Sequence, residues 1–156
     1  MPVNKRVISQ DYNTITVLLD VEISTDTTDT LLDADTLSFY DSNVPNSADI
    51  QLGLKHAFWN LSGDADNSGG RITLSFNHQS TDTVLLNLTG SGQISFSAPL
   101  SFPEINPNGE SNAGYNGDIN YDAEGNTTGH AVLTFNKISG YKMAWAGWRK
   151  PTQKIN

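Results

Sequence analysis

Apolar and polar residues alternate with a period of two in several short segments of this chain. Residues 71–77 show the pattern most clearly, with three apolar side chains on one side and four polar ones on the other. The same alternation recurs in segments 84–88, 93–97 and 131–136. A strand with one face in the core and one in solvent has this signature, so each segment is predicted to be an antiparallel β-strand.

Earlier segments fit the same class less regularly. Residues 15–23 are apolar nearly throughout, which predicts a strand buried on both faces. A short strand is expected over 36–40. A longer strand over 50–61 is expected to contain a bulge near His56, where the alternation is interrupted. Residues 25–35 are the one candidate helix, and their Thr and Asp content disfavours it.

Turn-forming residues separate these segments. Runs rich in Gly, Asn and Ser at 62–70, 89–92 and 123–126 are expected to be hairpin loops, and residues 105–117 a long loop. Eight to ten short strands at this spacing predict an all-β fold. The expected form is an antiparallel β-sandwich, jelly-roll-like, with extended terminal arms. An eight-stranded closed barrel is the alternative.

Length and composition agree with one β domain. The 156 residues divide into an N-terminal arm (1–10), a β-sandwich domain (11–147) and a basic C-terminal tail (148–156). Asn, Ser, Thr and Gly number 16, 15, 15 and 13, a composition that suits strands and turns and disfavours helices. Because the chain has no Cys, disulfides, thiol catalysis and Cys-ligated zinc are excluded.

Charge is unevenly distributed, although the formal net charge is only −8. All 17 acidic residues lie between Asp11 and Glu124, whereas the last twenty residues hold five bases and no acid. The basic ends either fold onto their own acidic body or reach that of a neighbouring copy. Nucleic-acid binding is disfavoured because the acidic body would repel a polyanion. The residues expected at an interface are Lys5, Arg6, Tyr141, Trp145, Trp148, Arg149 and Lys150.

One loop resembles the opening of a calcium-binding loop. Asp64, Asp66 and Ser68 stand at positions 1, 3 and 5, where oxygen ligands converge on the ion. The match then ends, because Arg71 and Ser75 occupy the positions of an aliphatic residue and a bidentate Glu. A polar loop tip is the ordinary alternative. Calcium at this loop is the one cofactor that the sequence suggests.

The sequence contains no recognisable catalytic motif. His56, His78 and His130 lie far apart and have no metal-ligand spacing, and no nucleophile elbow is present. Four carboxylates near the long loop could supply a glycosidase pair, namely Glu104, Glu110, Asp118 and Asp122. Solvated loop acids are far commoner, so the protein is expected not to be an enzyme.

Aromatic residues supply the alternative function. Trp59, Trp145 and Trp148 could form a stacking platform for a sugar ring, with Tyr115 and Tyr121 on the loop side. Tryptophan in a β-sandwich is more often a core residue. A carbohydrate-binding β-sandwich module is therefore the second hypothesis.

The chain resembles small structural proteins of tailed-phage virions, either capsid decoration (cement) proteins or tail and neck components. The resemblance lies in the unprocessed start at residues 1–6, the Cys-free body rich in Asn, Ser, Thr and Gly, and the basic terminal arms. It implies a non-enzymatic homo-oligomer that attaches to a major capsid or tail protein. With no secretion signal and no membrane segment, synthesis in the cytoplasm and residence in the virion are expected.

Overall fold

The computed structural model describes residues 3–41, 50–63, 70–101 and 115–141. This part of the chain forms nine antiparallel strands and one short 3-10 turn, η1. Their bounds are Val3–Gln10 (β1), Thr14–Glu22 (β2), Thr27–Leu32 (β3), Ala34–Thr36 (η1), Gln51–Ser62 (β4), Arg71–His78 (β5), Thr83–Thr89 (β6), Ser91–Ser101 (β7), Tyr115–Ala123 (β8) and Thr128–Ser139 (β9).

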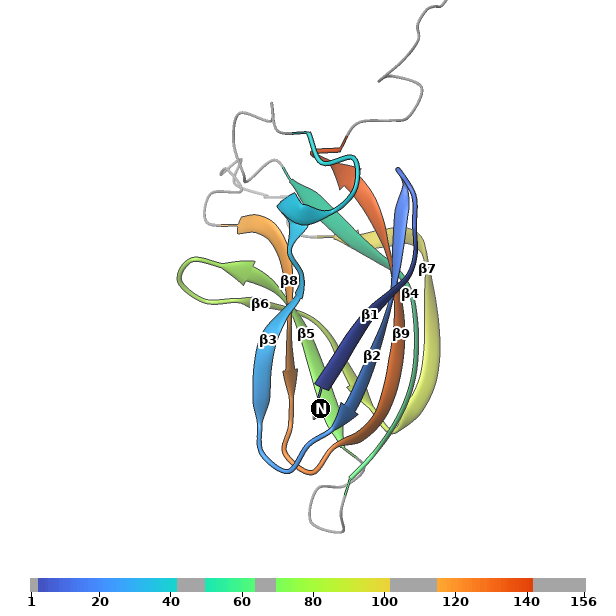
Figure 1. The fold of residues 1–156 in the computed structure, drawn as a ribbon, viewed down its shortest axis with the longest axis vertical. Coiled ribbons are helices and arrows are strands. Elements are labelled where there is room, and N and C mark those ends of the chain that lie inside the picture. Colours follow the sequence, from blue (N-terminus) through green and yellow to red (C-terminus); the bar gives the residue numbers. More distant parts are fainter. Residues whose placement is uncertain (1–2, 42–49, 64–69, 102–114, 142–156) are drawn as a thin grey trace, which may run out of the picture.

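The strands build two sheets that pack face to face (Figure 1). Sheet A has the order β1-β2-β9-β4-β7, and sheet B has the order β3-β8-β5-β6. From β2 to β9 this is the strand order of a jelly roll, to which β1 adds one further edge strand. The predicted sandwich of jelly-roll type is therefore confirmed, and the closed barrel is not the arrangement that forms.

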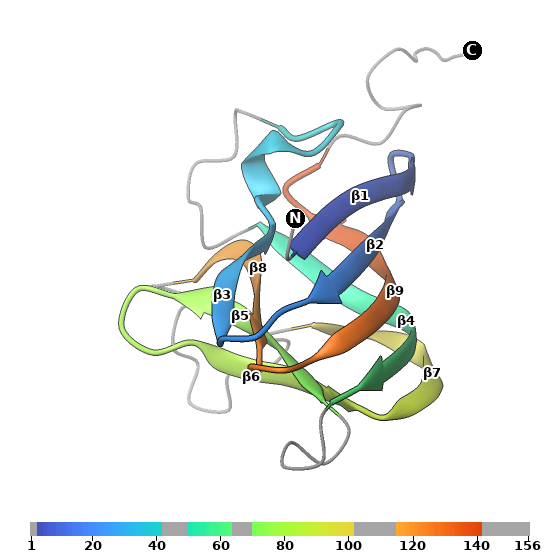
Figure 2. The same cartoon turned by 60° about the horizontal axis from the view of Figure 1, so that its bottom comes forward.

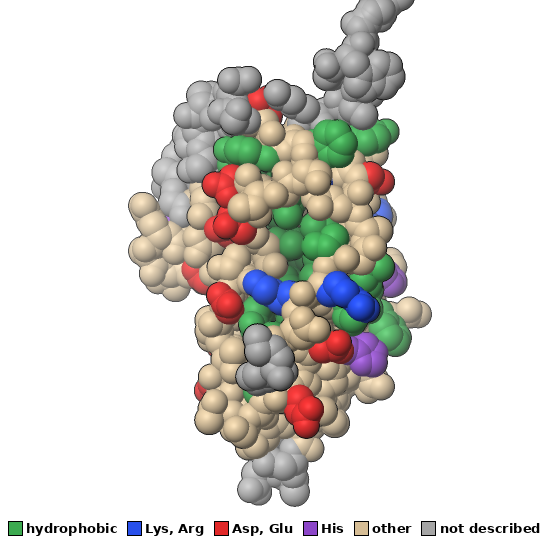
Figure 3. Space-filling view, viewed as in Figure 1, with side chains coloured by type: hydrophobic (Ala, Val, Ile, Leu, Met, Phe, Trp, Pro, Cys, Tyr) green, Lys and Arg blue, Asp and Glu red, His purple; other side chains and the backbone are tan. Residues whose placement is uncertain are grey.

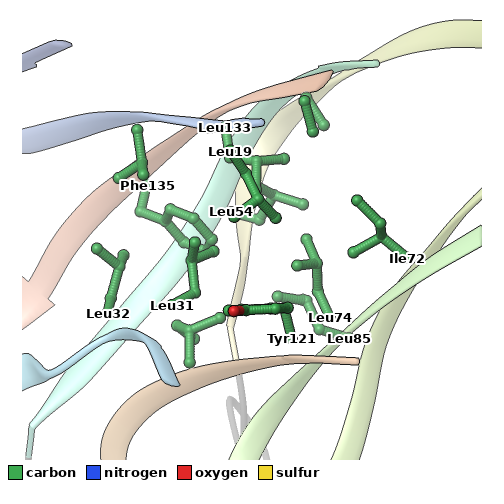
Figure 4. Close-up of a cluster of buried hydrophobic side chains, with 14 of the residues drawn as sticks. Leu19, Leu31, Leu32, Leu54, Ile72, Leu74, Leu85, Tyr121, Leu133 and Phe135 are labelled. Atoms are coloured by element: carbon green, nitrogen blue, oxygen red, sulfur yellow. The ribbon is translucent and has the colours of Figure 1, made fainter. Parts of the chain in front are cut away.

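The core lies between the two sheets and follows from the alternation. In β2 the odd-numbered side chains from Ile15 to Val21 are buried, while the residues between them face outward. The facing sheet contributes Ile72 and Leu74 from β5 and Tyr121 from β8 (Figure 4). Burial of these side chains supplies most of the driving force for folding. The strand expected to be buried on both faces instead buries one face only.

Three predicted hairpin loops connect different sheets instead. The links from β4 to β5, from β6 to β7 and from β8 to β9 each run from one sheet to the other (Figure 2). The hairpins among the described strands are β1–β2 and β5–β6, which pair with their sequence neighbours. The turn residues mark correctly where the chain reverses, but not which sheet it enters next.

Of three further local predictions, one is confirmed and two are wrong. The bulge near His56 is confirmed, because the register of β4 shifts between Leu54 and His56 against both neighbouring strands. The candidate helix over 25–35 is wrong: β3 and η1 occupy this segment. The expected strand over 36–40 is also wrong, since only Tyr40 makes a bridge, to Tyr141.

The first and the last of the described strands, β1 and β9, lie in the same sheet. Residues 3–10, assigned from the sequence to an N-terminal arm, form β1 and pair with β2 along its length. The last strand, β9, lies at the centre of sheet A between β2 and β4. Among the described residues, no helix is long and apolar enough to cross a membrane.

Candidate functional site

The predicted N-terminal interface residues have different surroundings. Lys5 pairs with an inward-facing residue of β2, and its Nζ donates a hydrogen bond to the main-chain oxygen of Thr30 on β3 (2.5 Å). This bond joins the edges of the two sheets, on the side that faces the viewer in Figure 3. Arg6 pairs with Leu18, so it lies on the outer face of sheet A, where it is exposed. Of this pair, Arg6 is therefore the residue that is available to a partner.

Tyr141 is used inside the subunit. Its hydroxyl donates a hydrogen bond to the main-chain oxygen of Ala34 (2.7 Å), and its ring meets Tyr40 edge to face at 6.3 Å. Burial raises the pKa of Tyr141 well above its usual range, so the hydroxyl stays protonated and remains a donor. These contacts hold η1 and the end of β9 together at the upper end of the sandwich (Figure 1).

Lys137, a base of the C-terminal segment, is buried beside Tyr141. Its Nζ donates hydrogen bonds to the main-chain oxygens of Asp11 (2.7 Å) and Ser38 (2.8 Å). The ammonium group also lies 5.6 Å from the ring centre of Phe39 and 5.4 Å from that of Tyr141. Burial lowers the pKa of Lys137, and the charge of Asp11 partly opposes the shift. The basic end of the chain thus begins with a structural lysine.

The remaining predicted site residues lie outside the described part of the chain. They are Trp145, Trp148, Arg149 and Lys150 of the interface, Asp64, Asp66 and Ser68 of the calcium loop, and Glu104 and Glu110 of the long loop. Their proposed roles stay predictions. No group of three or more His, Asp or Glu within the described residues is arranged to hold a metal ion.

The two described acids of the glycosidase hypothesis do not form a pair. Asp118 and Asp122 lie four residues apart on β8, which separates them by about 13 Å, more than the distance between the carboxylates of a glycosidase. Asp118 is half-buried and accepts a hydrogen bond from the main-chain N–H of Ala34 (2.8 Å). Burial, helped by the nearby charge of Asp35, raises the pKa of Asp118. Its contacts make Asp118 a structural residue at the upper end of the sandwich.

The aromatic residues of the sugar-binding hypothesis are also largely occupied. Tyr121 is 2% exposed and belongs to the core, so it cannot stack on a ligand. Trp59 donates its indole N–H to the main-chain oxygen of Thr89 (2.9 Å) and packs over Gly92, where a side chain would collide with its ring. The ring of Tyr115 lies 4.4 Å from that of His78. These residues stabilise the ends of the strands.

A different surface stands out, the outer face of sheet A. Leu18 on β2, Val132 on β9 and Phe58 on β4 are register partners, so their side chains form one continuous line across three adjacent strands. We call these three residues the central row. Phe58 is 42% exposed although it lies near the middle of the sheet, and its ring is 6.1 Å from that of His130. Leu18 and Val132 are half-buried on the same outer face, so this apolar line lies at the centre of the face without covering any part of the core.

Neutral polar side chains flank the central row and bond to each other across the strands. On one side the hydroxyls of Thr16 and Thr134 lie 3.0 Å apart, and Nδ1 of His56 lies 2.6 Å from the hydroxyl of Ser95. The register Thr16–Thr134–His56–Ser95 shows that all four belong to one row across the sheet. Cross-strand bonds of this kind order the side chains on the surface of the sheet.

Charged residues lie at the margins of the same face. Arg6 stands on the edge strand β1, and Asp20 and Glu22 stand at the lower end of β2. Figure 3 views this face from its edge, where hydrophobic and histidine side chains appear together along the right side of the molecule. The face thus has an apolar centre with polar side chains beside it, and the charges of Arg6, Asp20 and Glu22 lie toward β1 and the lower end of β2.

Sequence reasoning missed the central row. Leu18 was hidden in an apolar run, and Phe58 was grouped with the neighbouring Trp59. The signal was present for Leu18 and Val132, because alternation assigns both to the solvent side of their strands. Phe58 reaches that side because the bulge between Leu54 and His56 shifts the alternation of β4 by one residue. Three apolar side chains at solvent-side positions of adjacent strands thus form one row that no single segment of the sequence reveals.

Comparisons with known proteins add no family. No protein-family model matches this sequence, and neither does any curated protein sequence. Among solved structures, the chain is similar to KdgF from Halomonas sp., with a TM-score of 0.34 and 5% identity over 88% of this chain and 80% of that one. It is also similar to the coat protein of Tobacco streak virus, with a TM-score of 0.28 and 10% identity over 96% of this chain and 99% of that one. Likenesses at this level carry no argument about function.

Proposed function

We propose that this protein is a non-enzymatic structural protein of a phage virion, a capsid decoration protein or a tail component, that acts by self-association and attachment to a shell. The observation that carries the proposal is the outer face of sheet A. Its centre is apolar, polar side chains lie beside the centre, and Arg6, Asp20 and Glu22 lie toward one margin. Protein–protein contact surfaces are likewise depleted of charge at the centre and polar at the rim.

Rigidity supports the same role. The central row stands on three adjacent paired strands, and its polar neighbours are already bonded to each other at 2.6–3.0 Å. A surface whose side chains are ordered in advance loses little conformational entropy on association. This property suits a protein whose task is to hold its neighbours in place.

The distribution of charge supports attachment to a further partner. Arg6 is exposed on the edge strand β1, and the rest of the described acidic and basic side chains are also mostly at the surface. The body is acidic overall, and the segment after Tyr141 carries four bases and no acid. Opposite charges on separate parts of one chain favour ordered contacts between copies or with a shell protein.

Co-expression with a shell tests the proposal. The protein would be produced together with the capsid and tail proteins of a tailed phage, and the particles would be isolated by sedimentation. The protein is expected to sediment with the particles and, when purified alone, to have an oligomeric mass by light scattering. A protein that stays monomeric and remains in the supernatant would contradict the proposal.

A carbohydrate-binding role is the second candidate, and one observation favours it. Phe58 presents an exposed ring on a flat face, near His130 and the amides of Asn60 and Gln93, and aromatic rings beside amides can hold a sugar. Binding on a glycan array that is lost in Phe58→Ala would support this role. It would also count against self-association through the same face.

A further inference from the structure

We infer that the outer face of sheet A binds the same face of a second copy. The two copies are related by a two-fold axis that runs parallel to β9 and lies between their two A sheets. The inference rests on the proposed self-association and names the surface that performs it. It follows from the position of the central row, from the charge of Arg6 at one end of the row and from the area of the face.

The central row is placed symmetrically in the sheet. Sheet A has five strands, and β9 is the third of them, with β2 and β4 on its two sides. Val132 therefore lies on the middle strand, and Leu18 and Phe58 flank it at equal strand separations. When two copies meet face to face about an axis along β9, Val132 meets its counterpart and Leu18 meets Phe58 of the second copy. Apolar side chains thus cover apolar side chains along the whole row.

The charge of Arg6 favours an axis along β9 over an axis across the strands. The row continues outward to Arg6 on β1 and to Gln93 on β7. An axis along β9 places β1 of one copy over β7 of the other, so that Arg6 faces a neutral amide. An axis across the strands would place Arg6 over Arg6, and like charges in contact oppose association. With the axis along β9, Asp20 likewise faces Asn60, its counterpart in the next row.

The area is sufficient for a stable dimer. Five strands spaced about 4.8 Å apart span about 24 Å, and the nine residues of β2 extend about 30 Å. The face therefore measures about 700 Å² in each copy, and a pair buries about 1,400 Å² in total. This value falls within the range of specific protein–protein interfaces, about 1,200–2,000 Å². Aligned packing of two sheets, as inside a β-sandwich, is an established way to join such faces.

A charge at the centre of the row tests the inference. Val132→Lys would place two ammonium groups against each other at the dimer axis, and the dissociation constant measured by analytical ultracentrifugation is expected to rise at least about a hundredfold. Val84→Lys is the matched control, because Val84 is 58% exposed on β6 of sheet B. It makes the same chemical change away from the face and should leave dimerisation unaltered. Circular dichroism and thermal midpoints check that both variants are folded.

Cross-linking gives an independent measurement, and the absence of Cys makes single-Cys variants unambiguous. Packed sheets lie about 10 Å apart, too far for a disulfide, so a short bismaleimide is the suitable reagent. Val132→Cys is expected to cross-link into dimers, and Ser75→Cys, which pairs with Asn120 on the outer face of sheet B, is not.

The outcomes separate the two proposals. Loss of dimers in Val132→Lys but not in Val84→Lys, with cross-linking only through Val132→Cys, supports the two-fold contact. An oligomer that survives Val132→Lys, or that cross-links equally through Ser75→Cys, overturns the contact and leaves self-association by another surface. A wild-type protein that is monomeric and does not bind particles overturns the proposed function, and this contact with it.

Discussion

Lys137 offers the sharpest test of how the upper end of the sandwich is held together. Lys137→Met keeps most of the aliphatic stem and removes the ammonium group. The two main-chain oxygens of Asp11 and Ser38 then lose a donor at 2.7 and 2.8 Å. The rings of Phe39 and Tyr141, at 5.6 and 5.4 Å, lose a cation. The substitution thus removes four contacts, of which three join β9 to two loops and the fourth is to Tyr141, just after β9.

The expected loss in the free energy of unfolding follows from these contacts. Hydrogen bonds from a charged donor contribute about 1.5–3 kcal/mol each, and each cation–π contact at least about 0.5 kcal/mol. Removing the buried ammonium of Lys137 also recovers part of its desolvation cost, which lowers the net effect. The expected loss in the free energy of unfolding is about 2–4 kcal/mol. For a chain of this length the melting temperature should fall by about 5–15 °C.

The assay is urea unfolding followed by tryptophan fluorescence, with Lys55→Met as the matched control. Nζ of Lys55 donates one hydrogen bond to the main-chain oxygen of Ser97 (3.0 Å) at the surface. Its removal is expected to cost less than about 1 kcal/mol. Equal midpoints for Lys137→Met and the wild type would refute the structural role of Lys137. So would a loss no larger than that of Lys55→Met.

Three further predictions concern stability. Burial raises the pKa of Asp118 in the folded protein above 3.8, so the free energy of unfolding of the wild type falls as the pH rises from 3.8 through that raised pKa. Asp118→Asn cannot ionise and avoids this loss. The urea midpoint of Asp118→Asn should therefore rise relative to that of the wild type between pH 3 and pH 7. Gly129 has φ of +141°, and a Cβ there would overlap the main-chain oxygen of Asn60, so Gly129→Ala should lower the unfolding free energy by at least about 3 kcal/mol. Gly90→Ala, at φ of +60° in open space, should cost only about 1 kcal/mol, and equal losses would contradict the steric argument. Trp59→Phe loses one indole hydrogen bond and should cost about 1 kcal/mol, measured by thermal unfolding.

The sequence predicted the strands because burial on one face leaves a local trace. Segments 71–77 and 131–136 alternate as expected, and their inward residues, such as Leu74 and Leu133, are 0% exposed. The prediction was less complete for Ile94, which is 37% exposed although it points to the inner side of β7. β7 is an edge strand of sheet A, with β4 beside it in the described sheet, so its inner side is only partly covered. Alternation within one strand holds no information about whether that strand lies at the edge of its sheet.

The order of the strands was beyond local reasoning. Turn residues after Ser62, Thr89 and Ala123 look like those of hairpins, yet each link leads to the other sheet. The choice depends on which distant strand supplies the better partner, and that partner is not encoded near the turn. The central row could not be predicted for the same reason. Leu18 and Val132 are register partners from opposite ends of the chain, and no short motif connects them.

The place of β9 in sheet A has a consequence for synthesis. β9 is the last of the described strands to leave the ribosome, and it must insert between β2 and β4, which were made long before. Until residues 128–139 emerge, both of these strands have an open edge in the middle of the future sheet. Open edges are templates for wrong pairing with other chains. A nascent or truncated chain that ends before Thr128 is therefore the species that a chaperone must protect, and sheet A is completed only after residues 128–139 have emerged.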